Sequence, residues 1–173
     1  MKRIFAAMKN EDIKIRSFKK EDIEEVNRIW NGIVEEGVAF PQEETLGMET
    51  GLEFFEAQSY VGVAYNAVEG RIVGVYILHP NNVGRCGHIC NASFAVDEKL
   101  RGCRIGEKLV RHCIQMGKEI GFEILQFNAV VENNISALHL YNKLGFVKLG
   151  VIPKGFRTKS GKYENIIPHY IEL

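Results

Sequence analysis

Residues 101–106 read RGCRIG and place two glycines and two arginines directly before a segment of helical periodicity. The first backbone N–H groups of a helix have no carbonyl partner, and together with the helix dipole they attract anions. Gly102 and Gly106 would let the backbone approach a ligand closely, while Arg101 and Arg104 would add positive charge. The segment therefore predicts a phosphate or pyrophosphate site, with an ordinary tight turn as the alternative explanation.

A second group of residues with chemical potential begins 28 residues after Gly106, at Asn134. Asn134 precedes a short amphipathic segment, where it can serve as an ordinary helix N-cap. Tyr141 follows seven residues later, which is two helical turns less about 20°, so both side chains face the same way. A phenol at this position could donate a proton in a reaction, or it could simply pack in the core.

These two motifs resemble those of the GCN5-related N-acetyltransferase (GNAT) superfamily. Its phosphate loop reads R/Q-x-x-G-x-G/A, and its second motif reads N-x-x-A-x-x-x-Y followed by Gly-Phe. The second motif is complete here, whereas Arg104 stands where the phosphate loop usually has its middle glycine. We expect Arg104 to take helical angles and still offer its N–H, so that binding survives. The resemblance extends in element order from about Ile13 to Leu173.

The resemblance implies transfer of an acetyl group from acetyl-coenzyme A to an amine. It implies that the phosphate loop binds the pyrophosphate through its backbone amides, and that the strand before it bonds the pantetheine arm near Phe94 and Val96. Tyr141 would act as the general acid that protonates the departing thiolate. The complete set of implied cofactor-binding residues is Phe94, Val96, Arg101, Gly102, Cys103, Arg104, Ile105, Gly106, Asn134 and Ala137.

Two asparagines interrupt apolar strands and are candidates for contact with the acetyl acceptor. Asn91 lies in segment 88–96 and Asn128 in segment 122–131. A carboxamide inside a sheet is costly unless it is hydrogen-bonded, so the pair forms either an internal network or a site for a substrate carboxylate. Similarity of residues 80–96 and 127–154 to fungal acetyltransferases that act on proline analogues, such as azetidine-2-carboxylate, implies the carboxylate site.

Other acceptors are left open by the residues themselves. Segment 35–47, EEGVAFPQEETLG, carries four glutamates and could attract a cationic acceptor such as a polyamine. An antibiotic or a protein amine are further alternatives, as is a non-catalytic regulator that binds acyl-coenzyme A, although Tyr141 argues against the last. The general base is Glu132, His88 or ordered water.

The elements that must position these residues alternate irregularly. Strands are predicted at 13–18, 60–68, 71–79, 88–96, 122–131, 146–153 and 166–173, and helices at 19–36, 52–58, 105–120 and 134–144. This order predicts an α/β (α+β) mixed sheet of about seven strands with helices on both faces. The family resemblance implies that this sheet belongs to the GNAT-type acyl-CoA N-acyltransferase fold. We expect residues 1–173 to form one such domain. The order excludes a nicotinamide-dependent dehydrogenase, because no βαβ unit opens the chain.

The composition and the N-terminal sequence limit which partners and which cellular compartment we expect. Lys plus Arg and Asp plus Glu both number 22, so the net charge is zero and no nucleic-acid or membrane partner is expected. The apolar stretch at residues 4–8 is too short for a secretory signal, so we expect a cytoplasmic protein with reduced cysteines. Cys86 and Cys90, in CGHIC, have no second pair of ligands, so no metal is expected. The family resemblance allows a homodimer.

Overall fold

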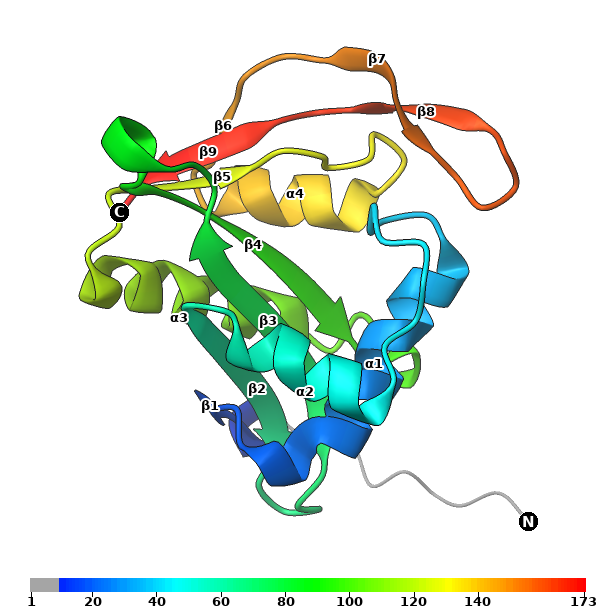
Figure 1. Ribbon diagram of the computed structural model, residues 1–173, viewed down its shortest axis with the longest axis vertical. Helices are drawn as coiled ribbons and strands as arrows, with labels where there is room; N and C mark the ends of the chain where they lie inside the picture. Colours follow the sequence, from blue (N-terminus) through cyan, green and yellow to red (C-terminus); the bar gives the residue numbers. More distant parts are fainter. Residues whose placement is uncertain (1–9) are drawn as a thin grey trace.

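The computed structural model describes residues 10–173 and is built on a sheet with strand order β1-β2-β3-β4-β5-β9-β6 (Figure 1). Its strands are β1 (Ile13–Ser17), β2 (Tyr60–Asn66), β3 (Ile72–Pro80), β4 (Ile89–Val96), β5 (Ile124–Phe127), β6 (Val147–Lys148) and β9 (His169–Glu172). The first four strands form an antiparallel meander, whereas β4 and β5 run parallel. The predicted mixed sheet is confirmed.

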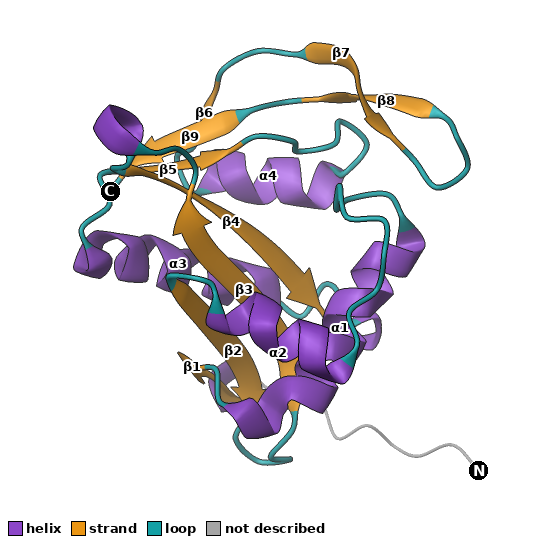
Figure 2. Cartoon of the chain, in the orientation of Figure 1, coloured by secondary structure: helices purple, strands orange, loops and turns teal. Residues whose placement is uncertain are grey.

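Helices cover both faces of this sheet (Figure 2). One face holds α1 (Ile23–Glu36) and α2 (Met48–Glu56), and the other holds α3 (Ile105–Ile120) and α4 (Ile135–Lys143). On α1 and α3, apolar residues at helical spacing form a buried stripe that packs on the sheet. The stripe of α1 comprises Val26, Ile29, Trp30, Ile33 and Val34.

The parallel pair β4 and β5 is short. Their ladder joins only Ile89 to Ile124 and Cys90 to Leu125, after which the strands separate. The helix α3 makes the crossover that a parallel pair requires. Beyond Cys90, side chains of both strands are therefore free to line a space between them.

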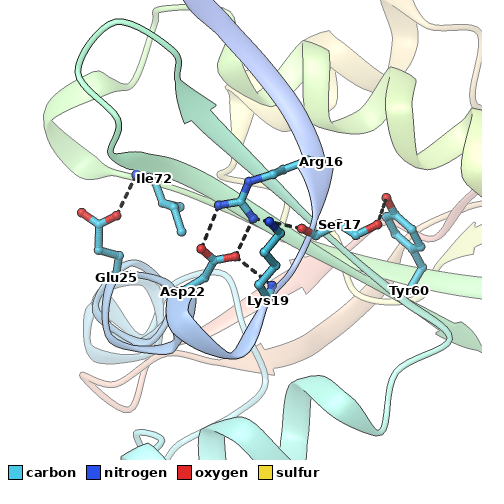
Figure 3. Close-up of polar contacts among 7 residues, drawn as sticks. All are labelled: Arg16, Ser17, Lys19, Asp22, Glu25, Tyr60 and Ile72. Atoms are coloured by element: carbon cyan, nitrogen blue, oxygen red, sulfur yellow. Dashed lines mark hydrogen bonds and ion pairs between the residues drawn. The ribbon is translucent and has the colours of Figure 1, made fainter.

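Polar contacts fix the start of α1 against the sheet (Figure 3). The Arg16 guanidinium donates to both carboxylate oxygens of Asp22, at 2.6 and 2.8 Å, and the Lys19 N–H donates to Asp22 Oδ2 at 2.8 Å. Glu25 accepts a hydrogen bond from the Ile72 N–H at 2.8 Å. Burial of Asp22 opposes its ionisation, but the hydrogen bonds from Arg16 and Lys19 outweigh burial and lower its pKa.

The last third of the chain differs from the sequence prediction. In place of one strand at 146–153, the chain forms the two-residue β6 and then a separate two-stranded sheet of β7 (Ile152–Arg157) and β8 (Tyr163–Ile166). A turn closed by the hydrogen bond from the Thr158 N–H to the Lys162 carbonyl joins them, with Gly161 at φ 83°. Figure 1 shows this ribbon beyond α4 at one end of the molecule.

The remaining helices and strands lie where they were predicted, with clear boundary differences at two of them. The helix predicted at 105–120 is α3, with Gly121 at its C-terminus. The predicted helix at 52–58 begins earlier, at Met48, and the strand predicted at 122–131 is shortened to β5. Within residues 10–173, no helix combines the length and hydrophobicity needed to cross a membrane.

Candidate functional site

A groove of about 650 Å³ runs from the C-terminal half of β4 between the N-terminal ends of α3 and α4. Tyr141 and nine of the ten predicted cofactor-binding residues line it; these nine are Phe94, Val96, Arg101, Gly102, Arg104, Ile105, Gly106, Asn134 and Ala137. Cys103 is not among the lining residues, since its side chain packs against the core. The structure thus brings both sequence motifs to one groove.

The loop before α3 offers backbone donors to this groove. The Cys103 N–H donates to the Leu100 carbonyl at 3.2 Å, and the Lys108 N–H donates to the Arg104 carbonyl at 3.3 Å. The backbone N–H groups of residues 104–107 lie between these two donors and precede the first intrahelical hydrogen bond, so they can bind an anion. A Cβ atom on Gly106 would come no nearer to other groups than 3.9 Å, at Leu140 Cδ2. Packing within the protein therefore does not require glycine here, and a larger side chain would enter the groove.

Arg104 has a left-handed backbone, with φ 61° and ψ 16°. The expectation that it takes right-handed helical angles is wrong. The loop must turn sharply to direct its amides at the groove, and Gly102, at φ 82°, takes the same left-handed region. A residue with a side chain is strained in this conformation by about 1–2 kcal/mol. Arg104 thus occupies, at an energetic cost, the position where the phosphate loop usually has glycine.

Ion pairs connect this loop to α1. Arg101 pairs with Glu36, which also lines the groove. The buried Asp97 accepts hydrogen bonds from Arg28 Nη2 at 2.9 Å and from the Lys99 N–H at 3.1 Å. The charge of Arg101 is therefore already compensated, so the backbone amides and the exposed Arg104 are the positive groups available to an anion.

Tyr141 is buried at the inner end of the groove. Its ring centroid lies 4.6 Å from that of Phe127 and 5.3 Å from that of Phe146. Burial raises the pKa of Tyr141 above that of an ordinary phenol. The phenol consequently keeps its proton at neutral pH, as a proton donor must.

A second pocket of about 240 Å³ adjoins the groove. Both cavities share Ala39, Phe94, Asn134, Ala137 and Tyr141 in their walls. Asn134 is the N-cap of α4, since its Oδ1 accepts a hydrogen bond from the Ala137 N–H at 3.2 Å. The N-cap interpretation is confirmed, and the same residue also borders both cavities.

The connection between α1 and α2 supplies one wall of the second pocket through Phe40 and Pro41. The ring of Phe40 packs on Trp30 at a centroid distance of 4.5 Å, and Trp30 Nε1 donates to Gln42 Oε1 at 2.9 Å. Sequence analysis did not identify Phe40 or Pro41 as site residues. The available signal was an apolar Ala-Phe-Pro step in an otherwise polar loop.

Asn91 and Asn128 both line this second pocket. Asn91 directly follows Cys90, the last residue of β4 that pairs with β5, and its Oδ1 accepts a hydrogen bond from the Ala92 N–H at 2.8 Å. Asn128 directly follows β5 and is hydrogen-bonded to Asn81 and Gln126. The separation of β4 from β5 thus brings the two asparagines to one cavity.

Charged side chains are placed elsewhere. Among residues 10–173, the lining of the second pocket includes no acidic or basic side chain. Glu132 accepts a hydrogen bond from Asn165 Nδ2 at 2.8 Å, Glu43 pairs with Arg157 at 2.9 Å, and His88 is exposed before β4. The described residues also contain no group of three or more His, Cys, Asp or Glu able to hold a metal ion.

Comparison with known proteins finds a matching family and a related sequence. The sequence model of the acetyltransferase (GNAT) family matches residues 24–146. The N-acetyltransferase aca1 of Schizosaccharomyces pombe is 34% identical over 100 residues, which are 58% of this chain and 47% of that protein. The chain thus spans about half the length of this curated relative.

Solved structures show the same fold. A GCN5-related N-acetyltransferase from Kribbella flavida superposes with a TM-score of 0.86 at 28% identity, over 94% of this chain and 99% of that one. The structure of yncA from Salmonella typhimurium, solved with its cofactor acetyl-CoA, superposes with a TM-score of 0.86 at 20% identity, over 93% and 94% of the two chains.

Proposed function

The chain belongs to the acetyltransferase (GNAT) family, and we propose that it transfers the acetyl group of acetyl-coenzyme A to the amine of a small amino acid or amino-acid analogue. The groove supports the donor half of this proposal. Its free helix amides suit the pyrophosphate, and the edge of β4 near Phe94 and Val96 suits the amides of the pantetheine arm. The similar yncA structure, solved with acetyl-CoA, supports the same assignment.

Acetyl-coenzyme A supplies an activated acetyl thioester. In the transfer a C–N bond forms and the C–S bond breaks, while the amine loses one proton and the thiolate gains one. Tyr141 holds a proton where the groove meets the second pocket, and burial keeps that proton in place at neutral pH. We assign it the role of general acid toward the sulfur.

The second pocket supports a small, carboxylate-bearing acceptor, and its uncharged lining is the observation that carries the proposal. A polyamine or an aminoglycoside would bring several positive charges into a pocket whose described lining has no acidic side chain. The carboxamides of Asn91 and Asn128 can instead donate hydrogen bonds to a carboxylate, while Phe40 and Pro41 contact apolar atoms. The glutamates of segment 35–47 do not line the pocket, which argues against a cationic acceptor.

A thiol-release assay tests this function directly. Acetyl-coenzyme A is incubated with proline, azetidine-2-carboxylate, other small amino acids, spermidine and an aminoglycoside. We expect thiol release with one or more amino acids and none above background with the cationic amines. Tyr141→Phe should lower kcat by about 100-fold or more while binding of acetyl-coenzyme A is retained.

Two further variants test whether the acceptor binds in the second pocket. Asn91→Ala and Asn128→Ala should each raise KM for the amino acid far more than KM for acetyl-coenzyme A. Equal effects on both constants would contradict the assignment of the second pocket. Binding of acetyl-coenzyme A without thiol release for any amine would favour a non-catalytic regulator.

A further inference from the structure

Three carboxamides meet beside the second pocket. Asn128 Nδ2 donates to Asn81 Oδ1 at 2.6 Å, and Gln126 Nε2 donates to Asn128 Oδ1 at 2.8 Å. Asn81 directly follows β3 and is fixed by its own N–H, which donates to the Ile89 carbonyl at 2.8 Å. Gln126 lies in β5, so the side chain of Asn128 is held between a residue of β5 and the residue that follows β3.

These contacts assign one orientation to the Asn128 carboxamide. Its oxygen accepts from Gln126 and, at 3.4 Å, from Asn81 Nδ2. Its nitrogen has two N–H groups, of which Asn81 engages one. The hydrogen-bonding capacity that Asn128 retains for a ligand is therefore chiefly that of a donor.

We propose that Gln126 and Asn81 are positioning residues that set the specificity of the acceptor pocket for a carboxylate. This inference rests on the proposed function and extends it. A carboxylate has only acceptor oxygens, so an Asn128 turned to present its own oxygen would repel it, whereas a held N–H binds it. The network fixes this choice before the acceptor arrives, so binding requires no rotation of the amide.

Two substitutions that add the same negative charge separate orientation from charge. In Gln126→Glu, a carboxylate oxygen would face Asn128 Oδ1, so the Asn128 amide must turn over to donate to it. In Asn81→Asp, the longer 3.4 Å contact from Asn81 Nδ2 is lost, but an oxygen still accepts from Asn128 Nδ2 and Gln126 still donates to Asn128 Oδ1, so the original orientation is kept. Steady-state kinetics are measured for both variants with proline or azetidine-2-carboxylate, whichever the wild-type protein acetylates, and with the corresponding carboxamide.

We expect Gln126→Glu to raise KM for the carboxylate acceptor by about 10-fold or more. Its preference for the carboxylate over the carboxamide, as a ratio of kcat/KM values, should fall by a similar factor. Asn81→Asp should leave that ratio within about threefold of the wild-type value. KM for acetyl-coenzyme A should change little in either variant, because neither residue lines the groove.

An equal fall of the carboxylate-over-carboxamide ratio in both variants would overturn the proposal, since the added charge alone would then explain the fall. An unchanged ratio in Gln126→Glu would also overturn the proposal. If Gln126→Glu does not fold, Gln126→Met removes the donor without adding charge and should lower the ratio, and an unchanged ratio overturns the proposal. A wild-type protein that releases thiol only with amines lacking a carboxylate would refute the proposed acceptor class and this inference together. Wild-type activity on amino acids with a negative variant result refutes the inference alone.

Discussion

At the scale of single residues, Arg104 and Gly106 differ in what their positions at the start of α3 require: one in backbone conformation, the other in space for a side chain. Arg104 has a left-handed backbone that glycine adopts more readily, whereas Gly106 has unoccupied space around its Cα. The family motif has glycine at the first position and glycine or alanine at the second, and the physical reasons differ. The position of Arg104 requires a left-handed backbone, whereas a residue without a side chain at position 106 keeps the groove open.

Arg104→Gly should therefore stabilise the fold and leave acetyl-coenzyme A binding largely intact. Relief of the left-handed conformation contributes about 1–2 kcal/mol, and the added flexibility of the unfolded chain offsets about 0.4–1 kcal/mol. The net gain, of up to about 1.6 kcal/mol, is measured by urea unfolding, and affinity by calorimetric titration with coenzyme A.

Lys154→Gly is the matched control, since Lys154 also has a positive φ of 56° but does not line the groove. It should gain similar stability with no change in affinity. Gly106→Glu is the opposite case, because it should fold normally and lose coenzyme A binding as a carboxylate enters the groove. A loss of stability in Arg104→Gly would contradict the strain argument.

At the scale of elements, the junction of β1 with α1 depends on one buried carboxylate. Asp22 accepts from two Arg16 nitrogens and from the Lys19 N–H, and its side chain is 9% exposed (Figure 3). Loss of Arg16 would leave the Asp22 carboxylate poorly solvated and without its charged partner. The junction positions α1, whose residue Trp30 in turn packs on Phe40 at the second pocket.

Asp22→Asn should lower the free energy of unfolding at pH 7 by about 1–3 kcal/mol. The folded-state pKa of Asp22 is lowered, so its contribution is complete above the unfolded value of about 4 and is lost as pH falls through the folded pKa. The difference between wild type and variant should therefore shrink below about pH 4. Urea unfolding at several pH values measures it.

Glu24→Gln removes a neighbouring exposed carboxylate and serves as the control for this experiment. Its effect should stay within about 0.5 kcal/mol at every pH. A constant difference between wild type and Asp22→Asn down to pH 2 would show that the charge of Asp22 is not what stabilises the junction.

Elements with strong local signals could be predicted from the sequence, and those held by distant contacts could not. The boundaries of α3 follow from its periodic apolar stripe and from Gly121. The ribbon of β7 and β8 is mostly exposed, and its sequence lacks the alternation of apolar and polar residues that indicates a strand. It packs on the rest of the molecule through the contact of Phe156 and Ile166 with Val131, which the sequence does not show. The carboxamides at 91 and 128 could be noticed as polar interruptions of apolar strands.

Residues that lie beside these asparagines were harder to predict. Asn81 follows the end of β3, and only the register of the folded sheet brings it to Asn128. Phe40 belongs to a loop whose path depends on its contact with Trp30. Local sequence patterns do not encode such pairings, because Asn81 and Asn128 are 47 residues apart and the path of the loop after α1 sets the contact of Phe40 with Trp30.

At the scale of the whole molecule, the short pairing of β4 with β5 creates the meeting point of two cavities. The groove lies along the α3 and α4 face, and the smaller pocket reaches the connection between α1 and α2. Tyr141 borders both, so a donor in one cavity and an acceptor in the other would meet beside a protonated phenol. The described lining of the second pocket, the proposed acceptor site, offers no titratable group other than Tyr141.

This arrangement predicts that the pH dependence of kcat/KM for the acceptor follows the acceptor amine and not a side chain of the protein. The neutral amine is the nucleophile, so kcat/KM should rise with pH toward the amine pKa. Because the pKa of Tyr141 is raised by burial, the phenol should keep its proton and no alkaline decline should occur up to about pH 10. Profiles are measured with proline and with 4-fluoroproline, whose amine is less basic, and the midpoint should lie at lower pH for 4-fluoroproline. Glu132→Gln should leave both midpoints in place, whereas one common midpoint for the two acceptors, moved by Glu132→Gln, would identify a protein base instead.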